Sequence, residues 1–315
     1  MDTVLPEHVA DLATTARRAF ADAGGVDLAR RAENDRDVRQ EAGDVLESLG
    51  ALELEPLAST DEALAAFALC REAGRVALPY PLDALVCRAD GGATALVDTA
   101  DPFVDHADLL DAIVAMDVRG AAYDAVVVGD PLGSRLAPFM VPVTLTQRAR
   151  SDALDAASTL GHTLASAWLL GTVEAAVDLC VEHVRTRRQF GQRIADFQAV
   201  QFQVADAVVA ASGLAELALF TIWRVTETGD GARTDALALR LHAADVARAT
   251  LRAAQQLHGA SGVAEEYDVA VLCRRAQAAV RSPASPERIL DVLTTAVRDG
   301  GFASLFPQGR NRGIA

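Results

Sequence analysis

The chain has 315 residues, 29 basic and 44 acidic side chains, a formal net charge of −15 and 51% hydrophobic residues. This length and composition indicate a globular protein with substantial cores, and the acidic balance argues against a general nucleic-acid or anionic-membrane binder. All 29 basic residues are arginine, which excludes the phosphate-loop, Schiff-base and general-base chemistry of lysine.

The four cysteines, Cys70, Cys87, Cys180 and Cys273, are widely spaced and form no CxxC or Cys/His pair. This spacing predicts neither a metal site nor a disulfide framework, and it favours buried thiols in a reducing cytoplasm. The first seven residues carry no basic region, and we recognise no 18-residue apolar run free of charge. The sequence therefore predicts a cytoplasmic protein without a membrane segment.

Residues 1–85 predict an N-terminal helical domain, because apolar residues recur at spacings of three and four. Paired glycines at 24–25, Gly50 and the Ser59 cap divide this stretch into three helices. Pro79 and Pro81 then end the third helix, since proline lacks the amide proton that a helix needs.

Residues 86–150 predict a shortened β middle section. Four short β-rich runs separated by Gly, Asp and Pro cover residues 94–97, 112–118, 122–128 and 139–145. This section is at the low end of the size of an independent domain.

Residues 151–315 predict a C-terminal domain of the four-helix-bundle type. Two long apolar-striped helices, one with its stripe ending at Val184 and one starting near residue 196, precede three more at about 233–257, 265–281 and 286–299. Long helices joined by short loops favour an antiparallel bundle, and the fold class is mainly α.

The turn between the two longest helices concentrates basic side chains, namely Arg185, Arg187, Arg188 and Arg193. Their forked guanidinium groups suit contacts with a phosphate or pyrophosphate, and Phe190 beside Gly191 adds an aromatic face with close backbone access. Cationic capping of a helix C-terminus with a solvated face explains the same spacing, and spacing alone favours this alternative.

A second segment, residues 255–262, carries two glycines and an amide side chain between two helices. Backbone amides in such a turn can hold a diphosphate. A loop that merely ends a helix explains the same residues.

Together these segments resemble the C-terminal domain of the acyl-CoA dehydrogenase family. The resemblance is carried by Arg-Arg-Gln-Phe-Gly at 187–191, Phe-Gln at 197–198, Gln-Leu-His-Gly-Ala-Ser-Gly at 256–262 and Glu-Tyr-Asp at 266–268. Residues 72–82 resemble the third N-terminal helix of that family and its exit. The middle section resembles the family least.

The resemblance implies an FAD site shared between subunits. A middle β-barrel of one subunit holds the isoalloxazine, and the helical domain of a neighbour contacts the adenine dinucleotide half. Arg187 would bind pyrophosphate oxygens, Phe190 would pack near the adenosine end, and Gln198 would hydrogen-bond the cofactor. The opposite diphosphate wall would comprise Gln256, His258, Gly259 and Gly262.

The catalytic base of the family is missing from this sequence. Family members remove an α-proton from the acyl thioester with a glutamate, and the two family positions fall on Ala284 and Gly161, which cannot accept a proton. His162 replaces an arginine expected beside the second position, and we interpret it as a packed or solvated helix residue. Glu287 is a weak candidate base, better explained as an acid at a helix start.

The middle section is too short for the complete barrel of the family and lacks its Trp-Ile-Thr strand, because Trp168 and Trp223 both fall in the helical region. This combination resembles the shortened subunits of α2β2 heteromeric acyl-CoA dehydrogenases of steroid-degrading actinobacteria. The resemblance implies a full-length partner subunit, an acyl-CoA substrate that is steroid-derived in those systems, and an electron-transfer acceptor for the flavin.

Two other hypotheses stay open. One is a homo-oligomeric dehydrogenase with a displaced base at Glu287, Asp152 or Asp155. The other is a non-catalytic scaffold subunit that has lost flavin, which the joint presence of both cofactor segments disfavours. A di-iron bundle is excluded because the sequence contains no Glu-x-x-His.

Overall fold

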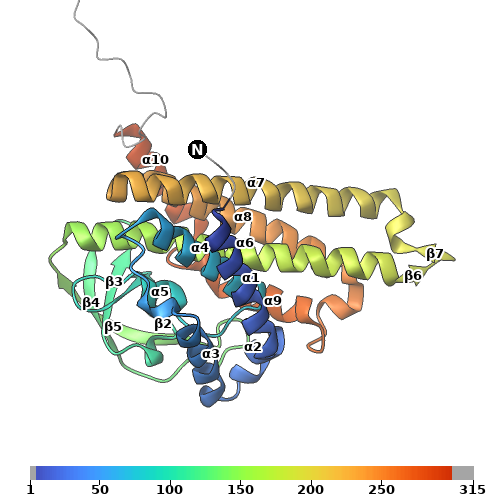
Figure 1. The fold of residues 1–315 in the computed structure, drawn as a ribbon, viewed down its shortest axis with the longest axis horizontal. Helices are drawn as coiled ribbons and strands as arrows, with labels where there is room; N and C mark the ends of the chain where they lie inside the picture. The colour runs from blue at the N-terminus through green and yellow to red at the C-terminus, as the bar shows by residue number, and fades with distance from the viewer. Residues whose placement is uncertain (1–4, 300–315) are drawn as a thin grey trace, which may run out of the picture.

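A computed structural model describes residues 5–299, except for the side chain of Asp230. The outer ends of the first and third expected domains, residues 1–4 and 300–315, lie outside the described residues. Figure 1 shows a small sheet near one end of three long helices and a short hairpin at their other end. The fold is mainly helical with a small β section between two helical parts, as the sequence predicts.

The N-terminal part consists of short helices that pack on one long C-terminal helix. Its elements are α1 (Glu7–Asp22), α2 (Val26–Ala32), α3 (Arg36–Ser48), η1 (Ala51–Glu53), α4 (Thr60–Arg75) and α5 (Leu82–Val86). The first expected helix ends at Gly24 and Gly25, as predicted, because both adopt positive φ, a conformation that glycine reaches without steric cost. The second expected helix is divided into α2 and α3. Ser59 caps α4 by accepting a hydrogen bond from the Glu62 amide at 3.2 Å.

The middle section is a five-stranded mixed sheet in the order β1-β3-β4-β5-β2. Its strands are β1 (Ala93–Val97), β2 (Phe103–Asp105), β3 (Ile113–Asp117), β4 (Ala122–Val127) and β5 (Met140–Arg148). The β1 and β3 strands pair in parallel, and the other pairs are antiparallel. Four strands overlap the predicted runs, whereas the three residues of β2 are too few to show a period of two.

The C-terminal part comprises α6 (Asp152–Thr186), α7 (Gln198–Thr228), α8 (Arg233–His258), α9 (Asp268–Arg281) and α10 (Pro286–Arg298). Ser151 caps α6 and Ser285 caps α10, each by accepting a hydrogen bond from a backbone amide three residues on. The basic turn between α6 and α7 forms a hairpin of β6 (Arg188–Gln189) and β7 (Gln192–Arg193), which the sequence did not predict.

Two glycines bring α4 and α6 into backbone contact. A Cβ on Gly74 would overlap the Trp168 carbonyl of α6, and a Cβ on Gly171 would overlap the Arg71 carbonyl of α4. Arg71 also donates two hydrogen bonds to Glu174 of α6, at 2.9 and 2.5 Å. This contact joins the N-terminal helices to the bundle and fixes the walls of the space between them.

The helices α6 and α7 are long and apolar enough to cross a membrane by composition. This corrects the reading of the sequence, because residues 156–173 contain no Asp, Glu or Arg. In the fold α6 is a core helix of the bundle, with 61% of its apolar window buried, whereas the window of α7 is 28% buried. Much of the apolar surface of α7 is therefore exposed on this chain.

We expect Gly171→Ala to lower the free energy of unfolding by about 3 kcal/mol, because the added methyl group overlaps the α4 backbone. Urea denaturation followed by circular dichroism measures the change. Gly213→Ala is the matched control, because Gly213 is exposed on α7 and a Cβ there meets nothing within 4 Å. That control is expected to be neutral or more stable; equal destabilisation of both variants would contradict the close contact.

Candidate functional site

An open groove of about 1100 Å³ lies between the β6–β7 hairpin, the start of α7 and the end of α8. It brings together two segments that are more than 50 residues apart in the sequence. Five of the seven predicted cofactor residues line it, namely Arg187, Phe190, Gln256, His258 and Gly259. They meet because α7 runs antiparallel to both α6 and α8, so the C-terminal ends of α6 and α8 lie at the same end of the bundle (Figure 1).

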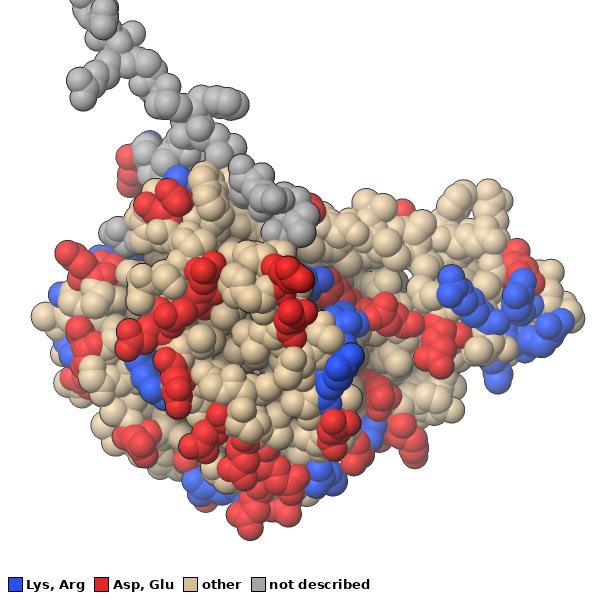
Figure 2. All heavy atoms as spheres, in the orientation of Figure 1, with Lys and Arg blue, Asp and Glu red and all other residues tan. Residues whose placement is uncertain are grey.

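The groove is free of acidic residues. Among the described residues that line it, none is Asp or Glu, although the chain carries a net charge of −15. Figure 2 shows basic side chains gathered at the hairpin end of the molecule, while acidic side chains dominate the rest of this face. Such a local positive potential favours a phosphate group in an otherwise acidic protein.

The arginines of this turn differ in whether their side chains already have a partner within the chain. Arg193 contacts Asp196 at 3.2 Å, and Arg188 donates to the Gly191 carbonyl at 3.5 Å. The exposed Arg187 side chain makes no hydrogen bond or ion pair within the part of the chain that the structure describes. Its guanidinium group is therefore available for a bidentate contact with a ligand.

Phe190 is held in an unusual position at the tip of the hairpin. Its side chain is 90% exposed and its φ is 53°, in the left-handed region that non-glycine residues rarely occupy. The ring lies edge-on to Phe197, with the ring centroids 6.3 Å apart. A strained backbone that holds a phenyl ring exposed to solvent indicates that the ring packs against a ligand or another chain.

The two remaining predicted cofactor residues lie outside the lining of the groove. Gln198 is exposed at the first position of α7, and Gln189 and Gln203 line the groove with their amides instead. Gly262 is buried, and a Cβ there would come within 2.5 Å of the Gln255 carbonyl oxygen. Gly262 thus closes the turn after α8 and keeps the wall of the groove in place.

Sequence reasoning missed His183, which also lines the groove. Its ring stacks on that of His258, with centroids 4.3 Å apart. The Nδ1 of His258 lies 2.8 Å from the Ala254 carbonyl, which only accepts, so Nδ1 carries the proton and Nε2 has the free lone pair. Burial, with smaller effects of His258 and Arg187, lowers the pKa of His183. The position of His183 four residues before Arg187 was the signal that could have placed it at the groove.

The groove fits the adenine and diphosphate half of a dinucleotide. Arg187 supplies a charged fork, three glutamine amides supply neutral donors, and Phe190 supplies a flat apolar surface. These are the groups that a diphosphate and an adenosine require, and the absence of carboxylates among the described lining residues removes the main source of repulsion.

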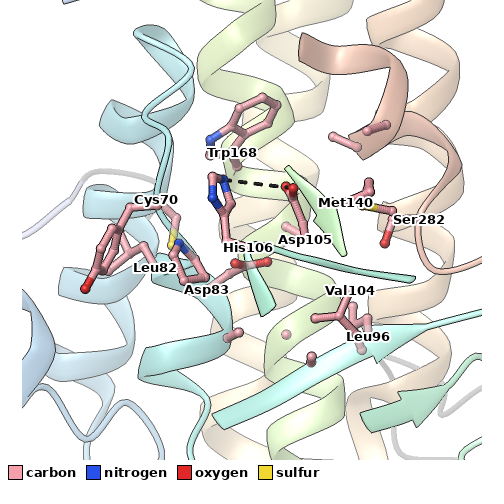
Figure 3. Close-up of a pocket in the computed structure, with 18 of the residues that line it drawn as sticks. Cys70, Leu82, Asp83, Leu96, Val104, Asp105, His106, Met140, Trp168 and Ser282 are labelled. Carbon is pink, nitrogen blue, oxygen red and sulfur yellow. Dashed lines mark ion pairs between the residues drawn. The ribbon is translucent and has the colours of Figure 1, made fainter. Parts of the chain in front are cut away.

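A second cavity of about 110 Å³, partly open to solvent, lies between the sheet and the helices α4, α5, α6, α8 and α9. Figure 3 shows Asp83, Asp105, His106 and Trp168 around it. Gly161 lines this cavity, and a Cβ there would make ordinary contacts with Leu96 at 3.8 Å. The second of the two base positions therefore faces this cavity.

Neither family base position carries a proton acceptor. Ala284 is fully buried and packs with Val118, Leu237 and Ile289. Gly161 has no side chain, and the carboxyl groups nearest to it along the cavity wall belong to Asp83 and Asp105. Burial raises the pKa of Asp83. Sequence reasoning missed both acids, since Asp83 lies in the five-residue helix α5 and Asp105 at the end of the three-residue strand β2, both too short to show a periodic pattern.

The alternative bases have local roles in the structure. Glu287 is exposed in the first turn of α10, where its own backbone amide and the Ser285 side chain lower its pKa, away from the range that suits a general base. Arg150 donates two hydrogen bonds to Asp155 at 2.7 Å, and Asp152 is exposed in the first turn of α6.

His162 is fully buried in α6, which decides between the packed and solvated interpretations of this residue. Neither ring nitrogen has a hydrogen-bond partner among the described residues. Burial lowers the pKa of His162 to about 3, with smaller contributions from Arg233 and Arg240. The imidazole therefore stays neutral at physiological pH and acts as a packing group.

Known proteins provide an independent comparison with this geometry. Residues 156–280, which include both groove segments, match the family described as "Acyl-CoA dehydrogenase, C-terminal domain". The chain is 27% identical over 251 residues to acyl-CoA dehydrogenase IpdE2 of Mycobacterium tuberculosis, covering 72% of this chain and 76% of that protein. The C-terminal region of the chain, residues 156–280, belongs to the acyl-CoA dehydrogenase family.

Other relatives match only in part. The probable acyl-CoA dehydrogenase YngJ of Bacillus subtilis is 32% identical over 117 residues, which are 37% of this chain and 30% of YngJ. The chain thus spans less than a third of the length of that relative in the alignment.

Solved structures of acyl-CoA dehydrogenases have the same fold. A chain of the ChsE4–ChsE5 complex from Mycobacterium tuberculosis has a TM-score of 0.76 at 17% identity, with 95% of this chain and 99% of that chain covered. A chain of the Tcur3481–Tcur3483 steroid ACAD has a TM-score of 0.74 at 20% identity, with 93% and 98% covered. The small sheet is therefore the middle section of an acyl-CoA dehydrogenase fold.

We expect His162→Leu to reduce the loss of free energy of unfolding that occurs between pH 7 and pH 5. The native state keeps His162 neutral down to about pH 3, whereas the unfolded chain takes up a proton near pH 6.5, so native stability falls as the pH falls through this range. The contribution is about 1.4 kcal/mol per pH unit. Urea unfolding at pH 7 and pH 5 measures it.

The exposed His8 provides the control, since His8→Leu is expected to leave the pH dependence of unfolding unchanged. If His162→Leu and the original chain lose the same free energy between pH 7 and pH 5, the residue is not held neutral by burial.

Proposed function

We propose that this chain is a subunit of a heteromeric FAD-dependent acyl-CoA dehydrogenase, to which it contributes the half-site for the adenine and diphosphate of FAD without the catalytic base. The observation that carries the proposal is an acid-free groove with a free arginine fork, on a chain whose two base positions are Ala284 and Gly161. A chain with a cofactor groove but no catalytic base needs a second chain that supplies the base.

The interior cavity supports this division of the flavin between chains. An engineered cavity of about 150 Å³ accommodates one benzene ring. The cavity beside β1 measures about 110 Å³ and is too small for the three fused rings of an isoalloxazine. The ring-holding part of the site is therefore expected from the partner, while the adenine end lies against Arg187 and Phe190 of this chain.

Exposed apolar side chains support a partner on the bundle. On α7 the exposed fractions are 60% for Phe202, 42% for Val208 and 71% for Val209. Contiguous exposed apolar surface on a globular chain indicates an interface. Phe190 lies at the hairpin that precedes α7, so a chain that covers this helix also reaches the groove.

In the assembled enzyme the partner is a full-length acyl-CoA dehydrogenase chain that provides the base and the β-barrel, in an α2β2 arrangement in the cytoplasm. Bound FAD supplies the hydride acceptor for α,β-dehydrogenation of an acyl-CoA, and an electron-transfer protein reoxidises it. The words "steroid ACAD" in the description of one structural relative favour a steroid-derived thioester. This chain binds the cofactor end and excludes water from it.

We expect Arg187→Gln to weaken FAD binding by the mixed complex about 30-fold, which corresponds to the loss of one charge-assisted contact of about 2 kcal/mol. Flavin fluorescence during dilution of the purified complex measures the affinity. Arg185→Gln is the matched control, because Arg185 is also exposed near the end of α6 but does not line the groove.

Equal FAD affinity of the Arg187→Gln complex and the unsubstituted complex would refute the half-site. A second arm tests the missing base: the chain purified alone is expected not to dehydrogenate any acyl-CoA, and turnover by the chain alone that disappears in Glu287→Gln would favour the homo-oligomeric alternative.

A further inference from the structure

The geometry points to a binding site for a small free carboxylate, of the size of acetate or propionate, in the partly open cavity beside Asp105 and His106. The ligand would be held by the guanidinium groups of Arg240 and Arg275. This inference does not depend on the flavin half-site, which lies at the other end of the bundle, at the hairpin that joins α6 and α7 (Figure 1).

Arg240 is a buried cation with free donors. Its side chain is 1% exposed, and it lines the cavity from α8. The Nη2 donates to the carbonyl oxygens of Ala279 and Ser282, the second at 2.6 Å, and so holds the group in one orientation. The Nε and Nη1 have no partner among the described residues. Burial lowers the pKa of Arg240 to about 10, which still leaves it charged at pH 7.

Arg275 provides a second cation on the wall formed by α9. Its side chain is 3% exposed, and its guanidinium carbon lies 4.2 Å from the centroid of the Phe139 ring. The Nε and Nη1 of Arg275 also have no partner among the described residues. Within the described part of the chain, no carboxylate oxygen lies within 4.0 Å of Arg240 or Arg275.

Two neutral groups complete the set of unsatisfied atoms around this cavity. They are the Thr94 hydroxyl on β1 and the His106 Nδ1 after β2, each in a side chain that is at least 97% buried. The φ of His106 is 54°, and its backbone amide donates to the Phe139 carbonyl at 2.8 Å. A strained backbone that places an imidazole with one unsatisfied nitrogen on a cavity wall is typical of ligand sites.

The acidic residues of the cavity wall do not neutralise these cations directly. Asp105 is 49% exposed, and its carboxylate lies 3.9 Å from the His106 Nε2, as the dashed line in Figure 3 marks. Asp83 is the other acid on the wall, and its raised pKa reflects the cost of ionising it there. Leaving two guanidinium groups buried without an ion pair is costly, and a bound carboxylate offsets this cost with bidentate contacts.

The cavity volume limits the ligand to a few atoms. A cavity of about 150 Å³ accommodates the six heavy atoms of benzene, so about 110 Å³ accommodates four or five. Acetate has four heavy atoms and propionate has five. Longer carboxylates exceed the space, and the corresponding amides lack the charge that two arginines select.

The test measures thermal unfolding and calorimetric binding of the full chain in sodium acetate. Sodium gluconate keeps the ionic strength constant, because gluconate is a carboxylate too large for the cavity. Acetate and propionate are expected to raise the melting temperature by several degrees with saturation, whereas acetamide and hexanoate are expected not to. Arg240→Met is expected to weaken acetate binding at least tenfold. The matched control is Arg252→Met, because Arg252 is exposed on the same helix.

Circular dichroism of Arg240→Met separates a lost ligand from a lost fold, and Arg275→Met provides a second variant from another helix. Equal effects of acetate and acetamide on the original chain would overturn the proposal, as would an unchanged acetate response in both folded arginine variants. Because acetate binding is measured without flavin, a negative result in this test does not bear on the proposed flavin half-site.

Discussion

The constraint on which this structure depends is that an acidic chain can hold a diphosphate only where its own carboxylates are kept away. The chain meets this constraint at the hairpin between α6 and α7, where arginines concentrate and the lining of the groove, as far as the structure describes it, has no acid. Coulomb repulsion from the rest of the molecule is weak there, because salt screens charges beyond about 10 Å. Phe190, exposed at the same tip, completes a surface that another molecule must cover.

The same long helices that carry this tip also define the interior cavity. Gly74 and Gly171 allow α4 and α6 to approach until their backbones touch, which sets the position of the N-terminal helices over Gly161 and the sheet. The space that remains is small and mostly apolar, with one arginine from α8 and one from α9 in its wall. A chain with the overall fold of an acyl-CoA dehydrogenase thus contains an interior that does not match the size of a flavin ring.

Local patterns in the sequence were sufficient for the long helices, for four of the five sheet strands and for the two segments of the groove, whereas the separation of α2 from α3 and the short α5 were not predicted. The meeting of the groove segments followed from the resemblance to a family and from the antiparallel bundle. The site roles of Arg187 and Gln256 stay predictions, and the groove supports them by bringing these residues together. Gln198 lies outside the lining, although other residues of the start of α7 line the groove.

The interior cavity could not be predicted from local sequence patterns. Arg240 and Arg275 occur in amphipathic helices where arginine normally marks a solvated face, and only the packing of α8 against α9 buries them. Asp83 lies in the five-residue helix α5 and His106 in the turn after β2, and neither segment is long enough to show periodicity. Burial of charge results from tertiary contacts between distant segments, so a single sequence contains no direct signal for it.

The most direct test of the account is the flavin content and native mass of the chain, first alone and then after co-expression with a full-length acyl-CoA dehydrogenase chain. The account predicts a colourless chain alone and a yellow mixed complex with one FAD for each pair of unlike chains. A yellow homo-oligomer with one FAD for each copy of this chain would contradict it, because the flavin ring would then have a complete site without a partner.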